Sequence, residues 1–298
     1  FSDIGVMAGI YATDWSWGSL FADLDLDGKT DIYISNGIKR RSNDNDYISY
    51  ISNDVIQGRL EGDIGDEDLR LVEKMPVIKI PNYAYRNVDG YRFTDVSAEW
   101  GLNQASFSNG SAYGDLDGDG DLDLVVNNVD QKAFIYRNNT ISPGKESESS
   151  YLKLTFRGDS LNTFGIGTRV LIPTDTGCLI RELYSTRGYL SSVNPELIFG
   201  LGGAKVVDSL IVIWPDKRYQ VLTNVKTNQS LTVKKGEANG FFKFVQPVIQ
   251  KSNLADSLGL SFRHKENSFS EFNREFLVPH MASAEGPPVA VGDINRDG

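Results

Sequence analysis

Cysteine and histidine are almost absent from this sequence. Its 298 residues include one cysteine, Cys178, and two histidines, His264 and His280. A single cysteine excludes a disulfide within the chain, and so few thiol and imidazole groups argue against a zinc site of the Cys/His type. We expect Cys178 to be a buried strand residue without a chemical role.

Long apolar runs and an excess of positive charge are also lacking. No stretch approaches the roughly 18 apolar residues that a membrane-spanning helix needs, so we expect no membrane span. Acidic residues outnumber basic ones by 40 to 30, which gives a formal net charge of -10. Because a nucleic-acid-binding surface needs clustered Lys and Arg, this balance argues against nucleic acid and favours small cations as partners.

The remaining composition is that of a globular protein, with 40% hydrophobic and 23% charged residues. At 298 residues the chain is long enough for two ordinary domains. The sequence starts at Phe1 without a methionine and stops at Gly298 inside an acidic stretch. We therefore expect an internal fragment of a longer protein, in which any export signal or lipid anchor lies elsewhere.

An internal repeat organises the first half of the chain. Residues 1–37 align with residues 93–129 without a gap, at an offset of 92 and with 13 identical positions. The segment from about 38 to 79 has no counterpart in the second copy. Without it the repeat is about 50 residues long, the length of one four-stranded propeller blade. The segment is charged and its apolar residues recur at helical spacing, which predicts a partly helical insertion in one blade.

Strand and turn signals dominate the rest of the chain. In the repeat region, 1–140, the Asp-Gly pair at 89–90 stands between two aromatic-rich runs and predicts a hairpin. A polar linker follows at 141–150. Short apolar runs separated by Gly, Asn and Pro fill residues 151–236 and predict a compact all-β domain, a sandwich or a barrel. Residues 237–298 are a connector and the truncated start of a further repeat, so the fold class we predict is all-β.

Two acidic loops carry the chemistry of the repeats. Asp at positions 1, 3 and 5 followed by Gly at position 6 reproduces the first half of an EF-hand calcium loop. Position 12, where an EF-hand supplies Glu, is Ile34 or Val126, and position 9 is Asp31 or Asp123. We predict a nine-residue loop that binds an ion through side chains at 1, 3, 5 and 9 and a carbonyl at 7. Such hard oxygen ligands favour Ca²⁺ over Mg²⁺.

The predicted metal ligands share this spacing in two complete loops and one truncated loop. They are Asp23, Asp25, Asp27, Lys29 and Asp31; Asp115, Asp117, Asp119, Asp121 and Asp123; and Asp293, Asn295 and Asp297. Lys29 and Asp121 stand at position 7, where the ligand is the backbone carbonyl. The alternative is that these Asp- and Gly-rich stretches are solvated turns.

Two parts of the chain resemble known families. The stretch FTDVSAEWGL…SNGSAYGDLDGDGDLDLVVNN resembles the FG-GAP or VCBS repeat, and YLKLTFRGDSLNTFGIGTRV…VDSLIVIWPD resembles the ASPIC/UnbV domain. Their order is similar to that in large cartilage-acidic-protein-like surface proteins of Bacteroidota. The resemblance implies calcium-loop β-propeller blades flanking a β-sandwich-like ASPIC/UnbV domain, metal-ligand places for the loop aspartates, and an extracellular or outer-membrane location. Asn295 departs from the aspartate pattern, although its amide carbonyl remains a ligand.

No catalytic constellation accompanies the acidic loops. We therefore expect a non-catalytic, calcium-binding cell-surface or secreted protein for adhesion, glycan binding or protein interaction, with glycans or other surface proteins as partners. One alternative is an accessory or catalytic part of a polysaccharide-degrading or phospholipid-cleaving enzyme. The other is a subunit of an outer-membrane nutrient-uptake complex.

Three short motifs have both a functional and a structural interpretation. Trp17 differs from its repeat counterpart Asn109 and is a candidate for stacking on a sugar. The sequence RGDS at 157–160 is an integrin-recognition motif only when a loop displays it, and because it follows a predicted strand we expect a turn. The sequence HKEN at 264–267 lacks the partners of a catalytic set, so we expect a hydrogen-bonded connection there.

Overall fold

The computed structural model describes residues 4–52, 71–142, 149–175 and 177–243, together with residues 259, 263 and 265. The chain divides into two compact units, Phe1–Lys243 and Phe244–Gly298, and the fold described below is that of the first. The truncated third loop at 293–297 and the histidine of HKEN lie outside the described residues.

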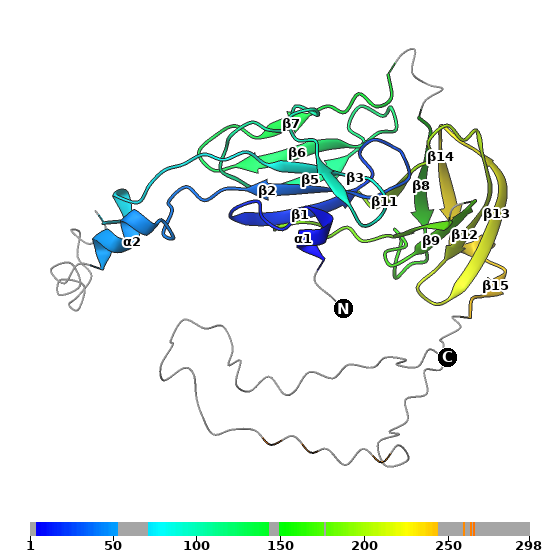
Figure 1. The fold of residues 1–298 in the computed structure, drawn as a ribbon. Helices are drawn as coiled ribbons and strands as arrows, with labels where there is room; N and C mark the ends of the chain where they lie inside the picture. Colours follow the sequence, from blue (N-terminus) through cyan, green and yellow to red (C-terminus); the bar gives the residue numbers. More distant parts are fainter. Residues whose placement is uncertain are drawn as a thin grey trace, which may run out of the picture. The chain divides into compact units, whose positions relative to one another are not determined.

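The first repeat forms a four-stranded antiparallel sheet in the order β1-β2-β3-β4 (Figure 1). The strands are β1 (Ser16–Ala22), β2 (Asp31–Asn36), β3 (Tyr83–Asn87) and β4 (Phe93–Asp95). The hairpin predicted around residues 89–90 joins β3 to β4, with Gly90 at a φ of 92°. Such a left-handed turn favours glycine because a Cβ is disfavoured there.

The second repeat forms a three-stranded antiparallel sheet in the order β5-β6-β7, which comprises β5 (Ser108–Gly114), β6 (Asp123–Asn128) and β7 (Phe134–Tyr136). β5 and β6 begin and end 92 residues after β1 and β2, and both pairs carry a register shift near their start. The predicted repeat is therefore a structural repeat. The two sheets share one core, which contains Leu20 and Tyr33 of the first and Leu124 of the second. The described residues contain no closed propeller.

The insertion between β2 and β3 contains the helix α2 (Asn45–Ile51), whose first turn is capped by the side chain of Asp44 accepting from the Tyr47 backbone N–H at 2.9 Å. This confirms the predicted helical character for this part of the insertion; residues 53–70 lie outside the described residues. A second short helix, α1 (Gly5–Ala8), precedes the first sheet.

Residues 151–241, here called the second β region, form two further sheets. One has the order β10-β9-β12-β13-β15, and the other has the order β11-β8-β14 with β14 parallel to β8. Both sheets contribute side chains to one core. The elements are β8 (Tyr151–Arg157), β9 (Arg169–Thr174), β10 (Gly177–Glu182), β11 (Glu196–Gly200), β12 (Val206–Ile213), β13 (Arg218–Lys226), β14 (Gln229–Lys234), η1 (Lys235–Glu237) and β15 (Gly240–Phe241).

The largest buried side chain of this core is Trp214, packed edge-on against Phe156. The expectation for Cys178 is wrong. It lies in β10 as a strand residue, but its side chain is exposed; β10 is the edge strand of its sheet, and three of its six residues, Cys178 among them, are exposed.

The second β region packs directly on the repeat sheets. β11 is buried on both faces: Leu197 and Phe199 belong to the core of the second β region, and Ile198 belongs to the repeat core. A hairpin at 185–192 also lies against the first strands of both repeats. A Cβ on Gly18 would come within 2.9 Å of the Tyr189 backbone nitrogen, so this position requires glycine.

Candidate cation sites

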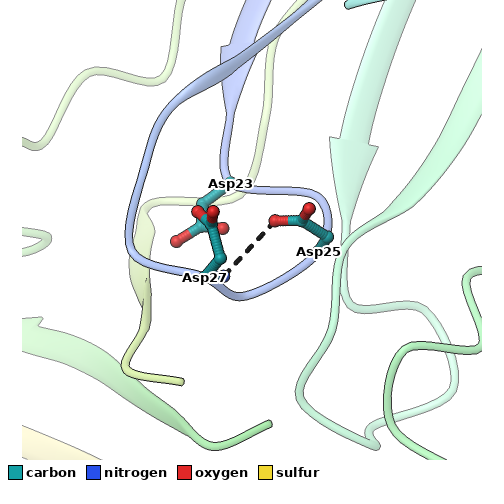
Figure 2. A group of neighbouring side chains, drawn as sticks. All are labelled: Asp23, Asp25 and Asp27. Carbon is teal, nitrogen blue, oxygen red and sulfur yellow. Dashed lines mark hydrogen bonds between the residues drawn. The ribbon is translucent and has the colours of Figure 1, made fainter. Parts of the chain in front are cut away.

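The first acidic loop, residues 23–31, connects β1 to β2. Asp23, Asp25 and Asp27 each offer a carboxylate oxygen, and these oxygens lie within 4.8 Å of one another. Figure 2 shows the three carboxylates on the inner side of the curved loop. Leu26 and Gly28 adopt positive φ angles of 59° and 90°, which tighten the curve. Positions 1, 3 and 5 are therefore brought together.

The second acidic loop, residues 115–123, connects β5 to β6 in the same way. Asp115, Asp117 and Asp119 also place carboxylate oxygens within 4.8 Å of one another. The backbone turns at Gly118 and Gly120, which have φ angles of 81° and 104°. Because the loops start and end at equivalent strand positions, the second trio occupies the same place in its repeat as the first.

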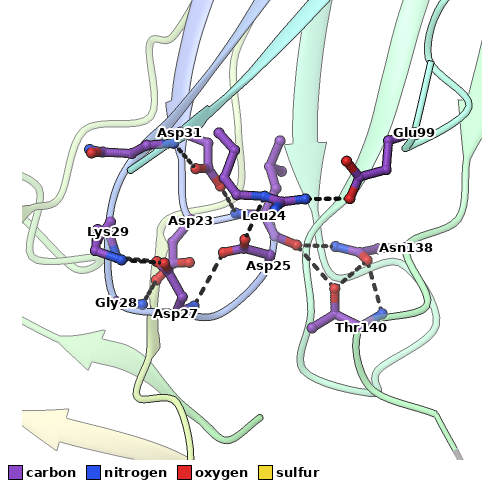
Figure 3. A network of polar contacts seen from close by, with 12 residues as sticks. Asp23, Leu24, Asp25, Asp27, Gly28, Lys29, Asp31, Glu99, Asn138 and Thr140 are labelled. Atoms are coloured by element: carbon purple, nitrogen blue, oxygen red, sulfur yellow. Dashed lines mark hydrogen bonds and ion pairs between the residues drawn. The ribbon is translucent and has the colours of Figure 1, made fainter. Parts of the chain in front are cut away.

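The position-9 carboxylate has other partners. In the first loop, Asp31 is fully buried and accepts hydrogen bonds from the backbone N–H groups of Leu24 at 3.0 Å and Asn87 at 2.9 Å (Figure 3). It therefore closes its own loop and connects it to β3, and it lies outside the group of three carboxylates whose oxygens converge. Its role as a metal ligand stays a prediction.

The second loop repeats this arrangement. Asp123 accepts from Leu116 N–H at 2.9 Å and from Asn138 N–H at 2.8 Å. The Asn side chains match as well: the amide of Asn87 donates to Thr30 O, and that of Asn138 donates to Leu122 O. The sequence contains a signal for this bond, since Tyr-Arg-Asn ends β3 and recurs from the last residue of β7, Tyr136.

Position 7 differs between the loops. Lys29 forms an exposed ion pair with Asp27, with Nζ and Oδ2 2.6 Å apart. Asp121 is fully buried, and its Oδ2 accepts from the Ile141 backbone N–H at 2.8 Å. Opposite charges at this position fit a ligand that is a carbonyl oxygen and not a side chain.

Burial makes the charged form of several loop carboxylates unfavourable. Desolvation raises the pKa of Asp23 to about 7, although Arg181 lowers it. Desolvation likewise raises the pKa of Asp31 to about 7 against two backbone hydrogen bonds, and that of Asp121 to about 7. A nearby divalent cation would reverse this effect by favouring the ionised form.

One oxygen makes the first loop a candidate cation site, although Asp119 Oδ2 in the second loop is likewise buried without a hydrogen-bond partner in the described part of the chain. Asp23 is only 2% exposed, its Oδ2 accepts from Gly28 N–H at 3.0 Å, and its Oδ1 is buried with no hydrogen-bond partner in the described part of the chain. An unpaired buried carboxylate oxygen is costly. Together with Asp25 and Asp27 it forms an all-oxygen donor set of the kind that hard cations such as Ca²⁺ prefer.

Both loops touch the second β region. The Leu26 carbonyl accepts from Gly202 N–H at 3.0 Å. In the second loop, Lys153 of β8 pairs with Asp115 at 3.0 Å and with Glu196 of β11 at 3.2 Å. Each acidic loop therefore lies at the junction between its repeat and the second β region.

The second β region is where the chain matches a known family. Residues 158–240 match the family model described as ASPIC and UnbV. This ASPIC and UnbV domain covers β9 to β14 and reaches the start of β15. β8 precedes the matched residues, yet its Leu152 and Leu154 are buried in the same core. No curated protein matches the chain, and the described residues contain no helix long and apolar enough to cross a membrane.

The short motifs have structural partners. The Trp17 indole donates to Gly37 O at 2.5 Å, and its ring lies 4.8 Å from that of Tyr189 in the hairpin at 185–192, while the side chain remains 36% exposed. In RGDS, Arg157 ends β8 and Asp159 pairs with Lys235 at 2.7 Å. The predicted turn holds the aspartate in an ion pair.

Proposed function

We propose that this chain belongs to a non-catalytic, calcium-binding recognition protein, secreted or displayed on the cell surface. Its two repeats act as blades of a β-propeller, and Ca²⁺ in the acidic loops stabilises the attachment of those blades to the ASPIC and UnbV domain. The observation that carries the proposal is the carboxylate trio of the first loop with the unpartnered, buried Oδ1 of Asp23.

Calcium would neutralise the negative charge of the trio and would give the buried Oδ1 of Asp23 a partner to bind. Asp23, Asp25 and Asp27 would hold it in the first loop, and Asp115, Asp117 and Asp119 in the second. The buried position-9 aspartates keep each loop closed through backbone N–H groups, so the loop geometry exists before the ion binds. A calcium affinity in the range of extracellular modules, roughly 10⁻⁴ to 10⁻³ M, fits such a site.

Calorimetric titration of Ca²⁺ into metal-stripped protein tests the cation part of this proposal. We expect heat of binding at two sites and a rise in melting temperature, with Mg²⁺ at equal concentration as the comparison. A melting temperature that does not change on addition of Ca²⁺ would contradict the proposal.

The recognition part is tested with the full chain on a glycan array, and in pull-downs from surface extracts, with and without Ca²⁺. We expect ligand retention that requires the ion, because the ion fixes the junction that presents the surface. Calcium-independent turnover of a polysaccharide would count against a non-catalytic role.

A further inference from the structure

A cavity of about 250 Å³ lies where both repeats meet the ASPIC and UnbV domain. Equivalent positions of the two repeats line it, Phe21 with Tyr113 and Thr30 with Leu122. The domain contributes two arginines, Arg181 from β10 and Arg187 from the hairpin at 185–192. The cavity is therefore built jointly by three parts of the chain.

Arg187 keeps an unused donor, since its Nε is buried with no hydrogen-bond partner in the described part of the chain, while its guanidinium also bonds the Tyr113 side chain. Arg181 donates from Nη1 to Thr30 Oγ1 at 2.7 Å, and Arg187 donates from Nη2 to the Glu182 carbonyl at 3.0 Å. Neither guanidinium forms an ion pair with a carboxylate among the residues that the structure describes. Two guanidinium groups beside one cavity, each fixed by a neutral acceptor, can together bind a carboxylate.

The acidic side chains of the cavity already have partners. Glu182 is bound by Arg169 at 2.7 Å and by the Tyr184 hydroxyl at 2.6 Å, and Glu196 is bound by Lys153 at 3.2 Å. The remaining acid in the lining is Asp23, which belongs to the first cation loop. Once an ion occupies that loop, Arg181 and Arg187 are the basic groups of the lining that have no carboxylate in an ion pair among the described residues.

Aromatic side chains provide the apolar part of the lining. Phe21 is 56% exposed and Tyr184 is 47% exposed, and both line the cavity. The guanidinium carbon of Arg187 lies 5.8 Å from the centre of the Tyr184 ring. A volume below the roughly 300 Å³ at which drug-sized pockets begin suits one sugar residue, and exposed aromatic rings suit the apolar face of such a ring.

We propose that this cavity binds a sugar acid, a uronate residue of an acidic glycan, with its carboxylate on Arg181 and Arg187 and its ring against Phe21 or Tyr184. This inference rests on the proposed function, because it needs the charge of Asp23 to be taken up by the bound ion. It adds the ligand class that the proposed function leaves open.

The test is isothermal titration of the full chain in calcium buffer with D-glucuronate and D-galacturonate. D-Glucose is the neutral control, and inorganic sulfate is the second anion. We expect a uronate to bind and glucose not to bind. We also expect Arg187→Met to weaken uronate binding roughly tenfold or more, since a charge-assisted pair is lost. Arg218→Met, which removes an arginine paired with Asp216, should leave binding unchanged.

Arg181→Lys keeps the positive charge but loses the planar guanidinium that can bind a carboxylate with two hydrogen bonds. This second variant keeps the proposal testable if Arg187→Met does not fold. We expect weaker uronate binding with an unchanged melting temperature. Sulfate binding as tight as uronate binding would overturn the sugar-acid class, and equal affinity of both arginine variants and the wild type would overturn the site. If calcium raises the melting temperature but no uronate binds, the inference falls and the cation function stands. If calcium does not change the melting temperature, the proposed function is wrong, and the inference that rests on it is wrong as well.

Discussion

The first and second acidic loops lie at equivalent places in their repeats, but different side chains surround their carboxylates. In the second loop every carboxylate of the trio has a basic partner. Lys153 pairs with Asp115 at 3.0 Å, and Arg137 reaches Asp117 at 2.8 Å and Asp119 at 3.7 Å. Protein cations therefore replace part of what a metal ion would supply.

The first loop is compensated less completely. Arg86, the repeat counterpart of Arg137, lies 3.5 Å from Asp25, and Lys29 pairs with Asp27. Asp23 has no ion pair among the described residues, although it is the most buried member of the trio. One sequence motif can therefore give two sites that differ in how much they depend on a cation, because the basic side chains that pair with the carboxylates come from elsewhere in the fold.

Removal of the ion should have the largest effect. We expect metal stripping to lower the melting temperature. The expected loss in the free energy of unfolding is up to about 2.7 kcal/mol per site, for a free ion concentration of 100 times the dissociation constant. Asp25→Asn should lose more of the calcium-induced rise than Asp117→Asn, its exact counterpart 92 residues later. Differential scanning calorimetry with and without Ca²⁺ measures both. Equal losses in the two variants would contradict the difference between the loops.

Two position-1 variants should act in opposite directions on the ion-free protein at about pH 8. Asp23→Asn removes a buried, unpaired charge and keeps an acceptor for Gly28 N–H, so we expect stabilisation by about 1–3 kcal/mol. Asp115→Asn takes a charged partner from Lys153, so we expect a loss of similar size. Urea unfolding in metal-stripped buffer measures both free energies of unfolding. Two changes of the same sign would contradict the assignment of Asp23 as the unpaired acid and Asp115 as the paired one.

The pH dependence should also separate the ion-free and calcium-bound states. The pKa of Asp23 is about 7 in the folded protein and 3.8 as the reference value for the unfolded chain. Between these values the folded state binds a proton that the unfolded state has released, so the ion-free protein should become more stable as the pH falls from about 8 to about 5. Calcium requires the ionised carboxylates, so its stabilising effect should shrink over the same range.

Melting temperatures of metal-stripped and calcium-loaded protein across this pH range provide the measurement. Asp23→Asn is the control, because it should remove the share of Asp23 from the response and leave the shares of Asp31 and Asp121, whose pKa values are also raised to about 7. A stripped protein that loses stability on acidification to about pH 5 would contradict the assignment of Asp23 as the buried, uncompensated acid.

The smallest expected effect concerns the ammonium group in the second loop. Lys153→Met removes a competitor for the carboxylate of Asp115, so calcium affinity at the second loop should rise, by roughly fivefold or about 1 kcal/mol. Calorimetry in an Asp25→Asn background isolates this loop. Lys29→Met is the matched control, since its exposed pair lies in the first loop. A fall in affinity would mean that Lys153 helps the loop to close and does not compete with the ion.

Much of the repeat region could be predicted from the sequence. The offset of 92 residues predicted the positions of β5 and β6 from those of β1 and β2, and the Asp-Gly pair at 89–90 predicted the β3–β4 hairpin. These predictions succeeded because they rest on local chemistry: turn residues, alternating apolar positions and carboxylates within one short loop.

Predictions that depended on distant neighbours did less well. Cys178 was expected to be buried, but it lies in the exposed first part of an edge strand. The hydrogen bonds that Asp31 and Asp123 accept from the ends of later segments were not predicted, because they depend on strand pairing; their role as metal ligands stays a prediction. The approach of the hairpin at 185–192 to Gly18 has no local signal at all.

Local sequence was enough to predict that Asp23, Asp25 and Asp27, and their counterparts in the second repeat, converge, because alternate residues of one tight turn place their side chains on its inner side. The tertiary structure decided how each trio is neutralised and what surrounds it. Lys153 lies 38 residues from Asp115, and Arg181 lies 151 residues from Thr30, so only packing of the second β region on the repeats brings these groups together. Burial then sets the cost of each unpaired charge, and burial is a property of the whole fold.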